Sequence, residues 1–363
     1  KDLKTNYCIL KSPLKGSVEH YKYGFGKKVF IDYYNILATI SSFITNKTNQ
    51  HELDNISNNI EIGINEGLNQ KLNLHKQIKN YIISIYSKVV VARKLIRKID
   101  PKLLITTGFY GKTFLTQAAK ESGIPCIELQ HGTIYQGHLG YHYPHVKKNS
   151  LTCFPDYILL FGEYWKKMAD FPISENRLIP VGYPHFEYSF IRSIKTKQSQ
   201  ILIISQNVQG TKLFELSKDL AKKLKKYKVV YRLHPKQYFN WEKNLLDKME
   251  DVPDNLVISG KDGSSLYELM ATSVIQIGIF STALYEGLGF GLKTIICKLP
   301  GWENMQAIIN NNYAYLLELD NIASFINDEI NIANTIKIDP DYFFKSNSTE
   351  SIVNTINSVI KKS

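Results

Sequence analysis

The chain has 363 residues, 44% of them hydrophobic, which is enough for two domains of about 150 to 200 residues each. Its 45 Lys and Arg residues outnumber 33 Asp and Glu residues, giving a net charge of +12. Such a charge suits nucleic acid, an anionic membrane surface or phosphate-bearing substrates. Because no arginine-rich arm, zinc-finger spacing or RNP-like aromatic motif accompanies the charge, we predict no nucleic-acid partner.

The cysteines and the apolar runs indicate in which cellular compartment the protein is expected. Four scattered cysteines at positions 8, 126, 153 and 297 form no CxxC pair, which argues against a disulfide framework and a thiolate zinc site. The most apolar helical stretch, "YYNILATISSFI", is too short to span a bilayer and carries polar residues. We therefore expect a cytoplasmic protein with no membrane span or signal peptide. A peripheral contact with the anionic inner face of a membrane stays open.

In the first half of the chain, short apolar runs alternate with helical stretches, as is typical of parallel α/β architecture. Residues 32–98 are predicted to be mostly helical. The runs "KLLITT", "IPCIEL" and "DYILLFG" are then predicted as buried strands, with the helix "GKTFLTQAAKES" between the first two. The helix "EYWKKMA" and the short strand "LIPVG" are expected to follow.

Residues 189–199, "SFIRSIKTKQS", are polar and basic without an apolar period, and we place a hinge there. Beyond it the strands "ILIIS", "VVYRL", "LVIS", "VIQIG" and "TIICK" alternate with helices, one of them over residues 240–249. This succession predicts an α/β fold of two Rossmann-like domains. We place the N-terminal, acceptor-binding domain at 1–188, the C-terminal domain at 200–335, and at 336–363 a C-terminal helix that packs back on the first domain.

Ligands of doubly wound folds bind beyond the carboxyl ends of the strands, so the loops there carry the candidate residues. In "RLHPKQ", a proline fixes the turn after a strand and places Arg232, His234 and Lys236 at the strand end. These donors would suit a pyrophosphate. The same residues would also fit an ordinary surface turn, so the motif by itself leaves both interpretations open.

The segment "FSTALYEG" predicts an N-cap at Ser281 and Thr282, and the free N–H groups of a helix N-terminus bind anions. Glu286 lies one helical turn further on, where it could accept hydrogen bonds from ribose hydroxyl groups. An ordinary N-cap followed by a surface glutamate would look the same in sequence. The loop "SQNVQG" after the first strand of the C-terminal domain would cover the phosphates with Ser205, Gln206 and Gly210.

The segment "ELQHGTIYQGHLGYHYPHVKK" holds four of the nine histidines of the chain. His138, His142 and His145 have spacings of four and three, which would suit metal ligands on one helix face. Two glycines and a proline interrupt the segment, so we predict no helix and no metal site there. We expect a loop that faces the substrate, with His138 and Tyr141 near an acceptor sugar, because tyrosine offers a flat apolar face and a hydroxyl group.

The stretch "TTGFYGKTFL" resembles a nucleotide-binding P-loop only in its "GKT". That motif requires a glycine five positions before Gly111, where this chain has Thr106, so we predict no P-loop. We expect instead a glycine turn that leads into a helix, with Tyr110 or Lys112 on the acceptor side.

In this order, "QHG", a second Rossmann unit, "RLHP" and "STALYEGLGFGLKTI" resemble the two-domain GT-B glycosyltransferases of bacterial surface polysaccharide synthesis. That group includes capsule Kdo transferases, sialyl- and polysialyltransferases and the CDP-glycerol glycerophosphotransferases, and the resemblance covers residues 100–310. It implies two Rossmann-like domains that face a central cleft. It also implies that the "HP" motif and the Ser/Thr pair hold the phosphates of the donor nucleotide, and that a residue directly before a glycine is the base.

The residue before that glycine is acidic in the sialyl- and polysialyltransferases. This chain has His131 before Gly132, which is closer to the histidine-glycine motif of the glycerophosphotransferases. Histidine, with an unperturbed pKa of about 6.5, suits a base near neutral pH. We therefore predict His131 as the base and Gly132 as part of the acceptor site. A purely orienting role for His131 is the alternative.

The resemblance implies a metal-independent, inverting glycosyltransferase without a cofactor, as for capsule or O-antigen synthesis. It would move a sugar from a nucleotide-activated donor, for example a CMP-linked acidic sugar, to a hydroxyl group of a glycan or lipid-linked glycan. The absence of a DxD sequence agrees, since positive side chains and a helix N-terminus can neutralise the leaving nucleotide. The alternatives are a sugar-nucleotide 2-epimerase, a CDP-polyol phosphotransferase and a non-catalytic protein of polysaccharide assembly.

Overall fold

The structure, a computed structural model, describes residues 8–11, 27–30, 37–39, 50–193, 196–238, 241, 250–329 and 339–362. Two compact units make up the chain. The first comprises Lys1–Leu129, Lys147–Ile158 and Val353–Ser363, and the second comprises Gln130–Val146 and Leu159–Ile352. Of the helix predicted over 240–249, all but residue 241 lies outside the described residues, as do residues 194 and 195 of the predicted hinge.

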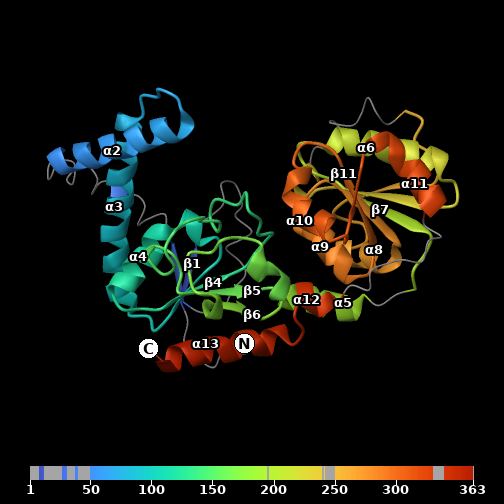
Figure 1. Cartoon of the computed structure of the whole chain (residues 1–363). Helices are drawn as coiled ribbons and strands as arrows, with labels where there is room; N and C mark the ends of the chain where they lie inside the picture. The colour runs from blue at the N-terminus through green and yellow to red at the C-terminus, as the bar shows by residue number, and fades with distance from the viewer. Residues whose placement is uncertain are drawn as a thin grey trace. The chain divides into compact units, whose positions relative to one another are not determined.

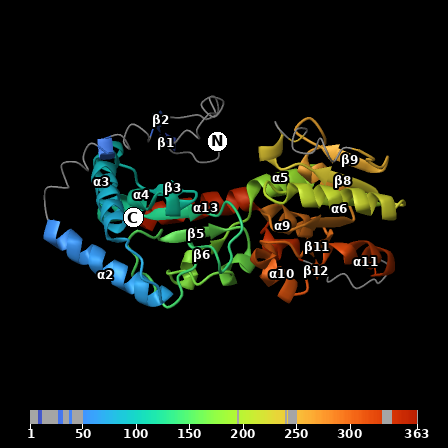
Figure 2. The same cartoon turned by 90° about the horizontal axis from the view of Figure 1, so that it is seen from above.

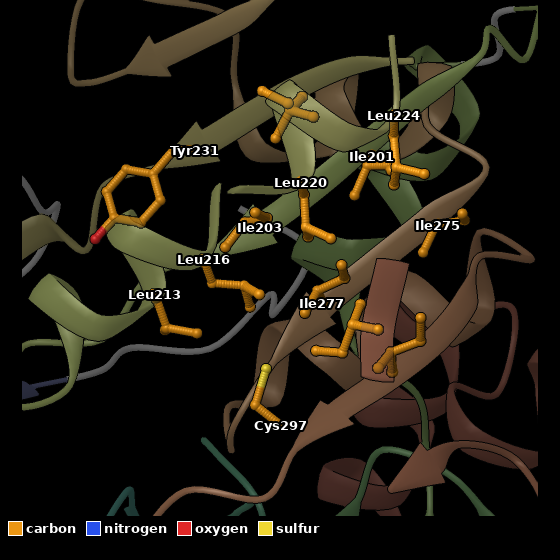
Figure 3. Close-up of a cluster of buried hydrophobic side chains, with 14 of the residues drawn as sticks. Ile201, Ile203, Leu213, Leu216, Leu220, Leu224, Tyr231, Ile275, Ile277 and Cys297 are labelled. Atoms are coloured by element: carbon orange, nitrogen blue, oxygen red, sulfur yellow. The ribbon is translucent and has the colours of Figure 1, made fainter. Parts of the chain in front are cut away.

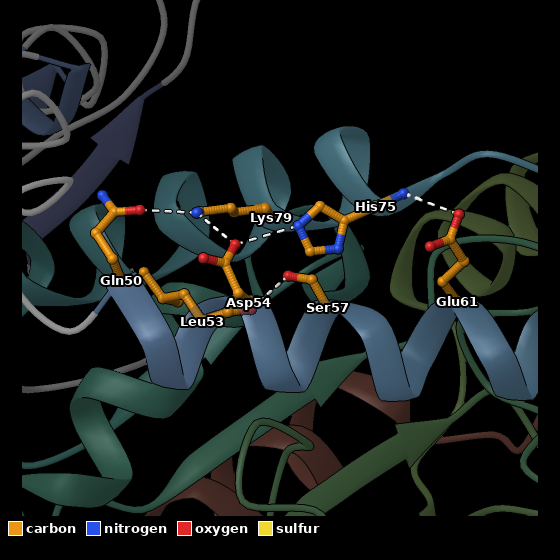
Figure 4. A network of polar contacts seen from close by, with 7 residues as sticks. All are labelled: Gln50, Leu53, Asp54, Ser57, Glu61, His75 and Lys79. Carbon is orange, nitrogen blue, oxygen red and sulfur yellow. Dashed lines mark hydrogen bonds and ion pairs between the residues drawn. The ribbon is translucent and has the colours of Figure 1, made fainter.

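Two consecutive helices of the first unit, α2 (Gln50–Leu68) and α3 (His75–Ile99), cross at a steep angle near the start of α3 (Figure 1), and both lie in the region predicted to be mostly helical. Figure 4 shows the polar contacts that join them. The Asp54 carboxylate accepts hydrogen bonds from Lys79 at 2.5 Å and from Nε2 of His75 at 3.1 Å. Glu61 accepts the backbone N–H of Leu74 at 2.6 Å, so a carboxylate occupies the amino end of α3, where the helix dipole favours negative charge.

A four-stranded sheet has the order β3-β4-β5-β6, and all four strands were predicted from the sequence. The α3 helix packs with α4 (Thr113–Glu121) and the first two strands around buried residues that include Ile96, Leu115 and Cys126. The strands are β3 (Leu104–Thr106), β4 (Cys126–Leu129), β5 (Tyr157–Leu160) and β6 (Leu178–Pro180). A separate parallel pair is formed by β1 (Cys8–Lys11) and β2 (Lys27–Phe30).

A six-stranded parallel sheet forms the centre of the second unit, in the order β12-β11-β10-β7-β8-β9. All five residues of β7 are buried, which is why its residues "ILII" after Gln200 form a continuous apolar run and do not alternate. The strands are β7 (Gln200–Ile204), β8 (Lys228–Arg232), β9 (Leu256–Ser259), β10 (Ile275–Gly278), β11 (Lys293–Cys297) and β12 (Tyr315–Leu317).

Helices cover both faces of this sheet (Figures 1 and 2). On one face, α6 (Gly210–Lys223) buries Leu213, Leu216 and Leu220 against strand residues such as Ile203 and Ile277, while its lysines remain outside (Figure 3). The α11 helix (Ile322–Glu329) shares this face. Further helices of the second unit are α5 (Pro184–Arg192), α8 (Leu266–Thr272), α9 (Thr282–Gly289) and α10 (Gln306–Asn310).

Several short segments are 3₁₀-helices. The segment predicted as the helix "EYWKKMA" is η3 (Glu163–Lys167), so its type was predicted wrongly although its position was right. The α5 helix runs to Arg192 and thus occupies the start of the predicted hinge. The remaining 3₁₀ segments are η2 (Phe109–Gly111), η4 (Glu175–Arg177), η5 (Pro235–Gln237), η7 (Trp302–Met305) and η8 (Leu319–Asn321).

A C-terminal strap, defined here as residues 339–348, packs against the second unit and leads from α12 (Pro340–Phe343) into α13 (Ser348–Lys362). The Trp165 indole donates a hydrogen bond to the carbonyl of Phe343 at 2.9 Å. The backbone approaches so closely that a Cβ atom on Gly182 would lie 2.1 Å from the carbonyl oxygen of Lys345. The predicted C-terminal helix is thus confirmed as a helix over Ser348–Lys362, and its last residues, 353–362, belong to the first unit.

The compact units do not follow the sheets, because β6 and α5 group with the second unit. The domain boundaries at residues 188 and 200 stay a prediction. None of the helices that the structure describes combines the length and the apolar character that a membrane span needs.

Candidate functional site

The strand order of the second unit reverses between β7 and β10. From this pair, β8 and β9 lie on one side, and β11 and β12 lie on the other. The loops after β7 and β10 therefore diverge, and ligands of doubly wound folds bind at such a switch point. The Gln206 side chain, just after β7, donates a hydrogen bond to the carbonyl of Phe280, just after β10. The two predicted donor loops thus meet here.

The α9 helix begins at this switch point. Its N-cap is Ser281, whose hydroxyl oxygen accepts the backbone N–H of Ala283 at 3.2 Å. Thr282 is the first helical residue and is partly exposed. The N-cap predicted from the sequence is confirmed. The N–H groups of Ala283 and Leu284 bind oxygen atoms of Ser281, and this end of the helix carries the positive end of the helix dipole.

The "QHG" turn lies against this helix N-terminus. A Cβ atom added at Gly132 would lie 3.7 Å from Oγ1 of Thr282, which is van der Waals contact. Both segments belong to the second unit. His131 is exposed on the same turn. The structure therefore brings together two motifs that are far apart in the sequence, the predicted base and the predicted anion site.

His234 is held in one tautomer by its own turn. Its Nδ1 accepts the backbone N–H of Lys236 at 3.2 Å, and its backbone N–H donates to Oε1 of Gln237 at 2.8 Å. Since Nδ1 is an acceptor, the ring proton is on Nε2. Burial lowers the pKa of His234, and the charge of Lys236 lowers it further, so the ring is neutral at neutral pH. His234 thus offers a single N–H donor from Nε2.

The guanidinium group of Arg232 makes its hydrogen bonds to other groups of the protein. Its guanidinium group donates to Oγ of Ser259 at 2.9 Å, to the carbonyl of Gly260 at 2.6 Å and to the carbonyl of Ser264 at 3.0 Å. A fourth bond reaches the Tyr238 hydroxyl at 3.0 Å. These bonds fix the loop after β9. Direct contact of Arg232 with a phosphate stays a prediction, whereas Lys236 is exposed.

Ser205 and Gly210 take part in a buried network beneath the loops after β7 and β8. Oγ of Ser205 lies 2.7 Å from the Tyr231 hydroxyl and 2.8 Å from Oε1 of Gln237. The Tyr231 hydroxyl donates to the carbonyl of Gly210 at 2.7 Å. A Cβ on Gly210 would lie 2.3 Å from Nε2 of Gln237, so glycine is needed for this approach. Both residues thus belong to the buried network that supports the loops after β7 and β8, and Ser205 is only 3% exposed.

Glu286 is buried on α9 and is not the surface glutamate that the sequence left as an alternative. Burial raises the pKa of its carboxyl group to about 7, although a hydrogen bond from Tyr267 opposes the shift. The Tyr267 hydroxyl also lies 3.2 Å from Nδ1 of His185. The predicted role of Glu286 as an acceptor for ribose hydroxyl groups stays a prediction, and the carboxyl group has a protein donor already.

The loop after the "QHG" turn is irregular, as its glycines and proline predicted. Nδ1 of His138 accepts the backbone N–H of Gly140 at 3.2 Å. Burial lowers the pKa of His138, and nearby His131 lowers it further. Tyr141 is 1% exposed and packs on His138 with 4.7 Å between ring centroids. A ring so buried has no face open to a sugar. Tyr141 can therefore support the ring of His138, but it cannot make the direct contact with the acceptor that we expected.

The other two histidines of the loop differ in their surroundings. Nδ1 of His142 accepts the backbone N–H of Asp170 at 3.0 Å, while His145 is exposed in a left-handed conformation, with φ 65°. Within the described part of the chain, no three His, Cys, Asp or Glu side chains gather as metal ligands would.

The turn around "FYGKT" belongs to the first unit, where Tyr110 is 41% exposed. The fully buried Glu128 carboxylate accepts the backbone N–H of Gly108 at 2.6 Å and that of Phe109 at 3.2 Å. A protein carboxylate thus takes the N–H groups that a phosphate would need. The sequence offered only a weak signal for this residue, an acidic side chain at the end of an otherwise apolar strand.

No protein-family model matches this chain, and none of the curated proteins matches it either. Among solved structures, it is similar to the UDP-GlcNAc 2-epimerase of Methanocaldococcus jannaschii, with a TM-score of 0.51, 13% identity, and coverage of 76% of this chain and 82% of that one. The UDP-GlcNAc 2-epimerase of Neisseria meningitidis, bound to UDP-GlcNAc, gives a TM-score of 0.51, 17% identity, and coverage of 76% and 81%. This likeness concerns the fold, and it confirms the predicted GT-B type of two Rossmann-like domains.

Replacement of His234 by Ala should weaken nucleotide binding about ten- to hundredfold, because a hydrogen bond to a charged group contributes about 1.5 to 3 kcal/mol. The measurement is the shift of the melting temperature with CMP, CDP, UDP, GDP and dTDP, since ligands of the native state raise it by mass action. His145→Ala is the matched control, because that ring is exposed on another loop. An unchanged nucleotide response in folded His234→Ala protein would remove the residue from the site.

Proposed function

We propose that this chain is a nucleotide-sugar transferase of bacterial surface polysaccharide synthesis that inverts configuration and uses no metal ion. The observation that supports this proposal best is the position of Gly132 beside the Thr282 hydroxyl group. It sets the turn of the predicted base at the helix N-terminus where the phosphates of a donor would bind.

The donor's phosphates are proposed to lie at the N-terminus of α9. The positive end of the helix dipole, the Thr282 hydroxyl group and Nε2–H of His234 are suited to phosphate oxygens. As the bond between sugar and phosphate breaks, negative charge grows on the leaving nucleotide. Fixed donors and the helix dipole stabilise that charge without a divalent ion, because they are already oriented toward it.

His131 is proposed as the general base. It takes the proton of an acceptor hydroxyl while that oxygen forms a bond to the anomeric carbon, and the bond from this carbon to the phosphate oxygen breaks. Since the attacking oxygen enters opposite the leaving nucleotide, the configuration inverts. The acceptor is a glycan or a lipid-linked glycan, with His138 beside His131 at the acceptor side.

A sugar-nucleotide 2-epimerase is the second candidate, favoured by the fold of the solved structures that this chain resembles. One structure of the Methanocaldococcus jannaschii epimerase holds UDP-GlcNAc and UDP. An epimerase would interconvert the donor without an acceptor, whereas a glycosyltransferase or a CDP-polyol phosphotransferase releases nucleotide only when an acceptor is added. A non-catalytic assembly protein would bind nucleotide without turnover. Incubation with UDP-GlcNAc and with CMP- and CDP-activated donors therefore separates the candidates.

Replacement of His131 by Ala should lower turnover about a hundredfold or more, the usual scale of general-base catalysis, and leave donor binding nearly intact. Steady-state nucleotide release measures turnover, and the thermal shift with nucleotide measures binding. His142→Ala should have a much smaller effect, because its ring binds a backbone N–H away from the turn. Equal losses in both variants would contradict the assignment of the base.

Activity should survive EDTA, because the proposed phosphate site consists of N–H and hydroxyl donors, and Mg²⁺ or Mn²⁺ would need oxygen ligands. The same nucleotide-release assay, run with and without the chelator, gives the answer. Loss of activity that Mg²⁺ or Mn²⁺ restores would overturn the metal-independent mechanism.

The α3 helix is the surface that we propose for a peripheral contact with an anionic membrane. It carries seven Lys and Arg residues and no Asp or Glu. A groove of about 400 Å³ runs along it, lined by apolar groups that include Ile85 and Val89, and the flanking Tyr81 and Tyr86 are 68% and 51% exposed. Aromatic and aliphatic groups beside basic ones suit the boundary between headgroups and acyl chains.

Vesicles that contain phosphatidylglycerol should therefore bind the protein more tightly than pure phosphatidylcholine vesicles in a sedimentation assay. Reversal of charge at Lys94, Arg97 and Lys98 to Glu should weaken this binding at least about tenfold, because each basic residue near an anionic surface contributes about 1 kcal/mol. The control reverses Lys222, Lys225 and Lys226, which are exposed in the second unit. Equal binding of both variants, or none to either vesicle, would refute the contact.

A further inference from the structure

We propose that Gln130 is a positioning residue that fixes the turn of His131 and Gly132, an inference that rests on the proposed function. Gln130 follows β4 and is 5% exposed. In the sequence it stood out only as the first letter of "QHG". The structure shows both ends of its side-chain amide in use, one on the backbone of Gly132 directly after the predicted base and one on the backbone of Phe161.

The contacts of Gln130 determine the orientation of its amide. Nε2 donates to the carbonyl of Gly132 at 2.9 Å, and Oε1 accepts the backbone N–H of Phe161 at 2.8 Å. The backbone N–H of Gln130 donates to the carbonyl of Leu159 at 3.0 Å. Because a rotated amide would set like groups against each other in a buried place, only one orientation satisfies all partners.

The bond to Gly132 spans the base. The backbone of His131 lies between Gln130 and the carbonyl that its side chain holds, so the residue is enclosed in a short hydrogen-bonded ring. Rotation of the turn would break this bond and leave a buried amide N–H unpaired, which is unfavourable. The bond therefore limits the directions in which the imidazole of His131 can point.

The other end of the amide is anchored to a rigid part of the second unit. Phe161, whose N–H binds Gln130, accepts the backbone N–H of Lys345 from the C-terminal strap at 2.8 Å through its carbonyl. Its ring stacks on Tyr183 with 4.6 Å between centroids. A continuous chain of hydrogen bonds thus runs from the strap through Phe161 and Gln130 to the carbonyl of Gly132. An anchor of this kind keeps a site residue within the narrow range that catalysis needs.

The turn that Gln130 holds is the one that contacts Thr282. A displacement of the base by about 1 Å is enough to lower turnover about a hundredfold, because reacting groups must meet in a near-attack geometry. Gln200 is a useful contrast. It is equally buried, at 2%, but its amide binds Ser273 and Thr272 inside the unit. Both glutamines stabilise the fold, but of the two only Gln130 forms a hydrogen bond to the turn of His131 and Gly132.

The first test needs no substrate. Histidine-labelled protein is titrated by NMR, with the signals of His131 assigned by their loss in His131→Ala. Gln130→Met, which keeps the length of the side chain and removes both hydrogen bonds, should shift the ring signals of His131 and change their titration. Gln200→Met should leave them as in the unchanged protein. Identical signals and titration of His131 in Gln130→Met would overturn the proposal.

The second test is a double-mutant cycle in the nucleotide-release assay. Gln130→Met alone should lower kcat about tenfold to hundredfold with little change in KM for the donor and shift the pH profile, whereas Gln200→Met should do neither. In the His131→Ala background, Gln130→Met should change kcat less than about twofold, because residues that act through one another are not additive. Full additivity would contradict the inference.

Where Gln130→Met does not fold, Gln130→Glu provides the same comparison. It keeps the acceptor for Phe161 and, while ionised, loses the donor to Gly132. If His131→Ala itself keeps full turnover, the proposed base is wrong, and the NMR result still decides whether Gln130 orients His131. Failure of the inference and failure of the proposed function are therefore distinct outcomes.

Discussion

The reversal of strand order between β7 and β10 is the constraint on which the candidate site depends. The crossover connections leave these neighbouring strands in opposite directions, so their loops separate and free the N-terminus of α9. The hydrogen bond from Gln206 to the carbonyl of Phe280 joins the two loops at their base. The phosphate site that we propose here would thus originate in topology, before any charged side chain is considered.

Buried polar networks set the shape of the loops around this N-terminus. Ser205, Tyr231 and Gln237 support the turn that presents His234, and Gln130 supports the turn that presents His131. In both cases a buried amide or hydroxyl group holds backbone groups of the turn, and the histidine that we propose for the site stands on that turn. Satisfied networks of this kind specify one conformation, because every alternative leaves a polar group unpaired in a medium of low dielectric constant.

The glycine turns at Gly108 and Gly132 contrast a structural turn with the proposed site. At Gly108, the buried Glu128 carboxylate takes the backbone N–H groups, so this turn has no donors left for a phosphate. At Gly132, the neighbouring polar group is the Thr282 hydroxyl at a helix N-terminus. A glycine shortly after a strand is common to both places, and the difference lies in which partner the fold sets opposite the turn.

The sequence by itself determined the alternation of strands and helices, the buried run of β7, the N-cap at Ser281 and the irregular loop after "QHG". These features depend on apolar periodicity, capping and the backbone preferences of glycine and proline, all of which are local. Only the tertiary structure decided that Gly132 lies beside Thr282, that Arg232 is bound to the loop after β9, and that Tyr141 and Glu286 are buried. The physical reason is that such contacts join residues far apart in the chain. Their meeting depends on strand order and on the hydrogen-bond partners that burial demands, and neither leaves a pattern in the neighbouring sequence.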